Sequence, residues 1–82
     1  NEFLPANATV QAGDVVRWTV IGSNTHTVTS GEAGTSDAGA LYDSGNVANG
    51  DTYCVRFDNP GAYDYHCVPH AAAGMVGTVT VE

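Results

Sequence analysis

The chain has 82 residues and a formal net charge of −7, with nine acidic residues, two arginines and no lysine. Phosphate binding requires a basic face, so this composition excludes nucleic acid as a partner and disfavours an anionic membrane surface. A chain of this length buries only about 60–65% of its unfolded surface, and we expect one domain over residues 1–82. The composition fits either a protein of high-salt environments, where screening reduces self-repulsion, or an ordinary acidic protein.

Short segments separated by turn residues are expected in the first half of the chain. Strands are predicted at residues 9–11, 15–21 and 25–30, with a turn at Gly13-Asp14 after the first. Alternation within 15–21 places Val16, Trp18 and Val20 on one face, so Trp18 is expected in the core. Residues 31–39 are rich in Gly, Ser, Thr and Ala and predict a loop.

The second half continues the pattern, with strands predicted at residues 41–44, 51–57, 62–67 and 77–81. Turns are indicated by Asn49-Gly50 and Asn59-Pro60-Gly61. Alternation predicts that Tyr53, Val55 and Phe57 face inward and Cys54 and Arg56 outward. In the next strand it predicts that Tyr63, Tyr65 and Cys67 face inward and Asp64 and His66 outward. The whole pattern predicts an all-β protein, a β-sandwich.

Four side chains form a candidate metal site: His26, Cys67, His70 and Met75. Two imidazoles, one thiolate and a weak thioether are the ligand set of a blue copper electron-transfer site. Zinc is the chemical rival, because two His and one Cys also bind it, but Met is a poor zinc ligand. Each residue alone would be read as structural; together, at this spacing, they predict one copper ion. Cys54 is then expected to be a free thiol.

The segment Cys-Val-Pro-His-Ala-Ala-Ala-Gly-Met-Val-Gly-Thr-Val-Thr-Val, which starts at Cys67, resembles the copper loop and last strand of plastocyanins and halocyanins, within the cupredoxin superfamily. The resemblance extends upstream through residues 12–18, 26–29, 42–45 and 59–63. It implies a Greek-key, cupredoxin-like sandwich with the copper at one pole. One departure is Thr27, where plastocyanins usually have an Asn that helps to pin the Cys loop.

The resemblance also implies a role for each ligand. Cys67 is the strong ligand and the origin of the blue colour, His26 the buried imidazole, His70 the imidazole near the surface, and Met75 the weak axial ligand. In plastocyanins the residue before the ligand Cys is a surface Tyr on a lateral electron route. His66 stands at that place, and we expect it to be exposed.

The predicted function is that of a type 1 blue copper protein, a soluble one-electron carrier and not an enzyme. It would work with transient redox partner proteins, without a small-molecule substrate, as a monomer. The alternative is a cupredoxin domain excised from a larger copper oxidase or nitrite reductase. His66 beside Cys67 favours that alternative, but no further His remains for a second copper site. A copper storage protein is disfavoured by the single Met.

No apolar run is long enough to span a membrane, and no signal peptide is present. The abrupt start at Asn1 suggests a mature or trimmed domain whose secretion signal, and with it a possible membrane anchor, has been removed. We therefore expect an extracytoplasmic location: the periplasm, the cell surface or the thylakoid lumen.

Overall fold

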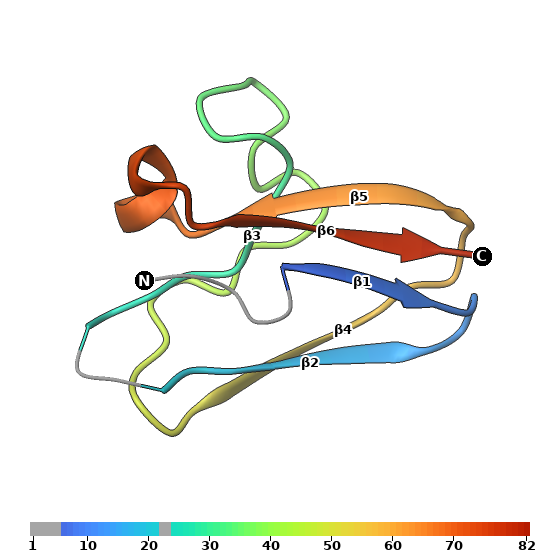
Figure 1. Ribbon diagram of the computed structural model, residues 1–82, viewed down its shortest axis with the longest axis horizontal. Helices are drawn as coiled ribbons and strands as arrows, with labels where there is room; N and C mark the ends of the chain where they lie inside the picture. Colours follow the sequence, from blue (N-terminus) through green and yellow to red (C-terminus); the bar gives the residue numbers. More distant parts are fainter. Residues whose placement is uncertain (1–5, 22–23) are drawn as a thin grey trace.

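The computed structural model describes residues 6–21 and 24–82, which fold into two layers of β-strands (Figure 1). Four strands form the first sheet, in the order β1 (Asn7–Val10), β6 (Val76–Val81), β5 (Gly61–His66) and β3 (Thr29–Ser30). Two antiparallel strands form the second sheet, β2 (Val15–Thr19) and β4 (Thr52–Arg56). In the first sheet β1 runs parallel to β6 and the other pairs are antiparallel. The predicted all-β sandwich is confirmed.

Alternation along the strands directs one face of each sheet into a shared core. Its buried members are Val28, Phe57, Tyr65, Val79 and Val81. Trp18 packs against this cluster, with its ring edge-on to Tyr65 at a centroid distance of 5.3 Å. Cys54 and Arg17 lie opposite one another on β4 and β2, and both are exposed. The facing predicted for these two strands is therefore confirmed.

The segments around residues 25–30 and 41–44 are less regular than predicted. Only β3 forms a strand in the first, and the second contributes one isolated β-bridge, between Thr29 and Asp43. In these segments a side-chain hydroxyl oxygen accepts a main-chain N–H that would bond to a carbonyl oxygen in a continuous β-ladder. The N–H of Val28 donates to Ser44 Oγ at 2.7 Å. The two segments thus lie side by side, joined partly by side chains. The other strand ends differ from prediction by one or two residues.

The predicted loop at residues 31–39 contains turns and no strand. Its first residue is fastened to β5, because the N–H of Gly31 donates to the carbonyl of Asp64 at 2.7 Å. Its last residue is fastened to β3, because the N–H of Gly39 donates to the carbonyl of Ser30 at 2.8 Å. The loop therefore begins against β5, which leads to Cys67, and ends against β3, the neighbour of β5 in the sheet.

A 3₁₀ turn, η1 (Val68–Ala73), follows β5 at one pole of the sandwich (left in Figure 1). Pro69 lies in its first turn, where a missing N–H has no cost. Gly74 ends it at φ 90°, in the left-handed region that suits glycine, and its N–H donates to the carbonyl of Ala71 at 3.0 Å. Among the residues described, no helix has the length and apolar character needed to cross a bilayer.

Candidate metal centre

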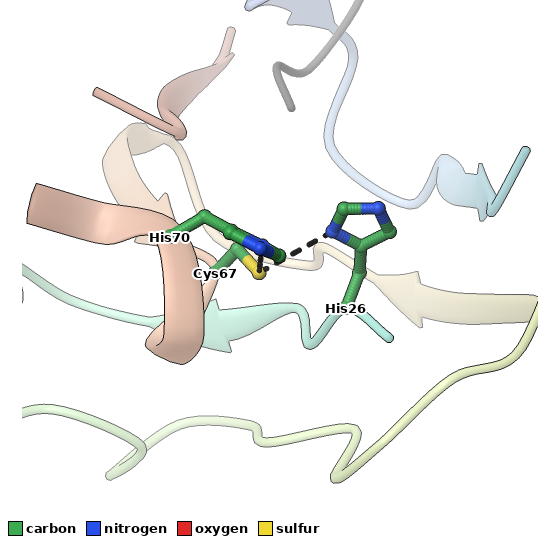
Figure 2. A group of neighbouring side chains, drawn as sticks. All are labelled: His26, Cys67 and His70. Atoms are coloured by element: carbon green, nitrogen blue, oxygen red, sulfur yellow. Dashed lines mark hydrogen bonds between the residues drawn. The ribbon is translucent and has the colours of Figure 1, made fainter. Parts of the chain in front are cut away.

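Three of the four predicted ligands meet at this pole. Sγ of Cys67 lies 3.7 Å from Nδ1 of His26 and 3.5 Å from Nδ1 of His70. The two imidazole centroids are 5.0 Å apart. Figure 2 shows both rings directing a nitrogen at the sulfur atom. One nitrogen from each ring and the sulfur lie within 4.8 Å of one another, so a single ion can contact all three.

Main-chain bonds place each of these side chains. Cys67 comes directly after β5, and the carbonyl of Cys67 accepts the N–H of His70 at 3.1 Å across the start of η1. His26 arrives from a different part of the chain and exchanges two bonds with Val47, at 3.3 and 2.7 Å. Forty-one residues separate His26 from Cys67. The site therefore exists only when the segment at His26 and the end of β5 are both in place.

The spacing of the three atoms fits a transition metal in a trigonal plane. Metal bonds of about 2.0 Å to imidazole nitrogen and about 2.3 Å to thiolate sulfur, the values for zinc, would separate N and S by about 3.7 Å at an angle of about 120°. The S–N distances of 3.5 and 3.7 Å are close to this value. Cys67 is fully buried and His26 is 7% exposed, so both side chains are largely shielded from bulk solvent.

Burial, and then the charge of nearby His70, lowers the pKa of His26 below its ordinary value of 6.5. A lowered pKa keeps the ring neutral at neutral pH. A neutral imidazole leaves a lone pair free for a metal, so the environment of His26 prepares it as a ligand without help from the metal.

Met75, the fourth predicted ligand, lies at the same pole. Its carbonyl accepts the N–H of Cys67 at 3.0 Å, and its N–H donates to the carbonyl of His70 at 3.2 Å. Met75 is 5% exposed and lines the same pocket as His26. Its backbone is thus held between Cys67 and His70, and it shares a pocket with His26.

Thr27 takes over the pinning role that the resemblance gives to Asn. Its hydroxyl oxygen accepts the N–H of Val68 at 2.9 Å, directly after the candidate thiolate. Its own N–H donates to Sγ of Cys67 at 3.4 Å. Two bonds in opposite directions therefore hold residue 27 against residues 67 and 68. A Thr hydroxyl is sufficient for the contact, although the residue differs from the usual plastocyanin residue.

The prediction that His66 is exposed is wrong, because its side chain is only 3% exposed. Its Nδ1 lies 2.8 Å from the carbonyl oxygen of Gly31. Since a carbonyl only accepts, Nδ1 carries the proton in this bond. Alternation along β5 places His66 on the outer face, but the loop that starts at Gly31 covers that face. A local pattern cannot reveal cover supplied by a segment thirty-five residues away.

His70 differs from His26 in being only partly buried. Its neighbours in η1 are small or apolar and open to solvent: Val68 is 58% exposed, and Pro69 and Ala72 are exposed as well. The sequence suggests the apolar residues Leu4 and Pro5 as extensions of this patch, and both lie outside the described residues. The candidate site therefore has a buried side at His26 and an open, uncharged side at His70.

Comparison with known proteins identifies the family. A model of the copper-binding proteins of the plastocyanin/azurin family matches residues 2–82. The chain belongs to this family. It is 39% identical to a chloroplastic plastocyanin of Tetradesmus obliquus over 98% of the chain and 58% of that protein, so it spans somewhat more than half of that relative. It is 33% identical to a plastocyanin of Scenedesmus fuscus, over 98% of the chain and 86% of that protein.

Solved structures of a cupredoxin and of a plastocyanin have the same fold. A purple cupredoxin from Nitrosopumilus maritimus superposes with a TM-score of 0.87 at 30% identity, covering 99% of the chain and 82% of that protein. Oxidised plastocyanin from Dryopteris crassirhizoma gives a TM-score of 0.82 at 28% identity, covering 99% of the chain and 88% of that protein. The expected cupredoxin fold, nearest to plastocyanin, is confirmed, and copper is the metal that the His26, Cys67 and His70 group supports.

The sequence prediction did not identify two residues behind the site, Thr29 and Asp43. Both lie in segments that resemble plastocyanins and halocyanins, but neither had been given a role. The available signal was the segment Tyr-Asp-Ser-Gly at residues 42–45, in which Ser44 and Asp43 accept hydrogen bonds from Val28 and Thr29, just after His26.

Proposed function

We propose that this chain is a one-electron carrier that holds a single copper ion through His26, Cys67, His70 and Met75. The observation that carries the proposal is the convergence of two imidazole nitrogens on the sulfur of Cys67, at 3.5 and 3.7 Å, at the pole where Met75 is buried. When bound, copper supplies a Cu(I)/Cu(II) couple at a site that suits neither oxidation state fully. The protein then has to keep the arrangement of the ligands unchanged while the charge of the copper ion changes.

The chain is built to hold its ligands in place. Each ligand residue is fastened through its backbone: His26 to Val47, Cys67 to Met75 and Met75 to His70. The thiolate accepts the N–H of Thr27 as well. A rigid sandwich behind these contacts limits movement of the ligands, and preorganised ligands lower the rearrangement that electron transfer requires.

We propose the surface around His70 as the port for electrons. One face of the site is closed by the buried His26, whereas His70 approaches the surface among Val68, Pro69 and Ala72. A small uncharged patch lets a partner protein come close and then leave, as weak redox encounters require. The net charge of −7 would steer a partner with a basic surface, and salt would weaken this steering.

The remaining features of the proposal follow from the family. The names of the relatives describe plastocyanins, in three cases chloroplastic ones, and this supports an extracytoplasmic location. We propose a single domain over residues 1–82, working as a monomer with transient redox partner proteins. No bond chemistry on a substrate is proposed, because all four candidate ligands come from the protein and leave no open position for a substrate.

Addition of Cu(II) to the metal-free protein tests the proposal. An intense visible absorption band, from charge transfer between the Cys67 thiolate and the metal, is expected at one equivalent, followed by reversible one-electron voltammetry. Absence of the band would refute the thiolate–copper site. Reduction of nitrite or dioxygen by the loaded protein alone would favour the excised-enzyme alternative instead.

A further inference from the structure

We propose that Asp43 and Thr29 are positioning residues for the copper site and that they act on the Cys67–Val68 peptide through Thr27. The effect on the metal rests on the proposed function. The hydrogen-bond chain itself does not, because every member is an atom of the protein. Neither residue is a ligand, and neither touches the sulfur.

A continuous chain of hydrogen bonds joins these residues. The N–H of Val68 lies 2.9 Å from Thr27 Oγ1, which lies 3.0 Å from Thr29 Oγ1. Thr29 Oγ1 in turn lies 3.2 Å from Oδ1 of Asp43. The two threonines are 5% and 2% exposed, whereas Asp43 is exposed. The chain thus begins at the peptide next to the candidate thiolate and ends at a carboxylate at the surface.

The direction of every bond in the chain is determined by its two ends. A carboxylate only accepts, so the single hydroxyl proton of Thr29 is donated to Asp43. Thr29 can then only accept from Thr27, which fixes the Thr27 proton in turn. The oxygen of Thr27 is left to accept the N–H of Val68. Each hydroxyl donates once and accepts once, and the negative charge of Asp43 sets the orientation.

This orientation explains why a Thr can replace the usual Asn beside His26. A free hydroxyl rotates and can donate or accept. Within the chain the Thr27 hydroxyl has one orientation, with its lone pair toward Val68. Asp43 is itself held by the N–H of Gly45 at 3.0 Å, so the outer end of the chain is also fixed. Hydrogen bonds in such chains strengthen one another in a buried environment.

The consequence concerns the candidate thiolate. Thr27 holds the loop through two bonds, one to Val68 and one from its own N–H to the sulfur of Cys67. If the first weakens, the two segments separate and the N–H bond to the sulfur lengthens. A thiolate with a weaker hydrogen bond donates more charge to the oxidised metal, so we expect the reduction potential to fall.

Amide hydrogen exchange of Val68, followed by NMR on the whole protein, tests the proposed series of hydrogen bonds. It is measured in the diamagnetic Cu(I) form and again in the metal-free protein. Thr29→Val removes one hydroxyl without changing the shape of the side chain, and we expect about fivefold faster exchange at Val68. Thr27→Val removes the acceptor itself, and about tenfold faster exchange is expected. Thr29→Ser keeps a hydroxyl and should restore the exchange rate of the parent.

Thr78→Val is the matched control. Thr78 Oγ1 also donates to a carboxylate, Asp64, at 2.9 Å, but this pair joins the exposed sides of β5 and β6 and makes no bond to Thr27. The Thr78→Val substitution should leave the amide exchange rate of Val68 and the reduction potential at the values of the parent protein. If Thr29→Val behaves like this control, the proposal is overturned.

The reduction potential is the second measurement. Thr29→Val and Thr27→Val should both lower it, and Thr29→Val should add nothing once Thr27 is already Val, because Thr29 acts only through Thr27. If the two substitutions shift the reduction potential additively, the proposed hydrogen-bond chain is refuted. If the buried variants do not fold, Asp43→Ala tests the same prediction from the exposed end, and unchanged Val68 exchange there would refute it. Absence of a blue band from the parent protein would overturn the proposed function. The exchange rate of the Val68 amide in the metal-free protein would still show whether the hydrogen-bond chain exists.

Discussion

His66 and Gly31 are joined by a hydrogen bond of 2.8 Å between the imidazole Nδ1 and the carbonyl oxygen, although they lie thirty-five residues apart. The N–H of Gly31 also donates to the carbonyl of Asp64, two residues before His66. The loop is thereby closed over the outer face of β5 beside the candidate thiolate. His66 is therefore a buried residue that joins β5 to the loop at Gly31.

His66→Ala should destabilise the protein. It removes a buried ring and leaves the carbonyl of Gly31 without its side-chain donor, which together should cost about 2–3 kcal/mol of unfolding free energy. The thermal midpoint should fall by about 10–20 °C in a protein of this size. His66→Asn, which can place an N–H near the same carbonyl, should recover part of the loss. A midpoint equal to that of the parent would show that His66 contributes nothing to the fold.

Cys67→Ser and Cys67→Ala should both abolish the blue colour. The thiolate provides the charge-transfer band, and neither a hydroxyl nor a methyl group can replace it. Cys54→Ser is the control, because that thiol is exposed on β4 and should leave the spectrum unchanged. The measurement is the visible spectrum after addition of one equivalent of Cu(II). Full colour in either Cys67 variant would refute the assignment of this ligand.

Met75→Leu should keep a blue site and raise the reduction potential. The thioether donates weakly, donation favours Cu(II), and its removal should therefore favour Cu(I). Leu has nearly the same volume, so the buried position should stay filled. Voltammetry of the two proteins provides the comparison. An unchanged or lower potential would count against Met75 as the axial ligand.

Cys54 should react with a thiol reagent in the copper-loaded protein, whereas Cys67 should not. Cys54 is exposed and Cys67 is fully buried as well as being a candidate ligand. One equivalent of thiol is expected in the loaded protein, and a second, slower one after the copper is removed. Two fast thiols in the loaded protein would mean that no metal protects Cys67.

Ala72→Glu should slow electron self-exchange at high ionic strength without changing the colour. The side chain of Ala72 is exposed in η1, so a charged group there would keep a second molecule away from His70. Ala62→Glu adds the same charge at the exposed start of β5, far along the strand from Cys67, and is the matched control. Self-exchange that is equally fast in all three proteins would place the port elsewhere.

The sequence alone determined the all-β class, the facing of β2 and β4 and the copper chemistry of the family, and it named the four candidate ligands. These features are local or chemical. Alternation with a period of two appears within a few residues, and the spacing of Cys67, His70 and Met75 reflects one short loop. His26 could be named from its residue type and from resemblance, before anything was known of its position.

Only the tertiary structure decided which side chains are covered and which hydrogen bonds form. His66 follows the alternation of an outward residue, yet the loop at Gly31 buries it. Thr27 lacks the amide of the usual Asn, yet its hydroxyl is oriented through Thr29 by Asp43, which lies fourteen residues beyond Thr29. Burial and hydrogen-bond direction depend on segments that are distant in sequence and meet only in the folded protein, and a local pattern carries no record of them.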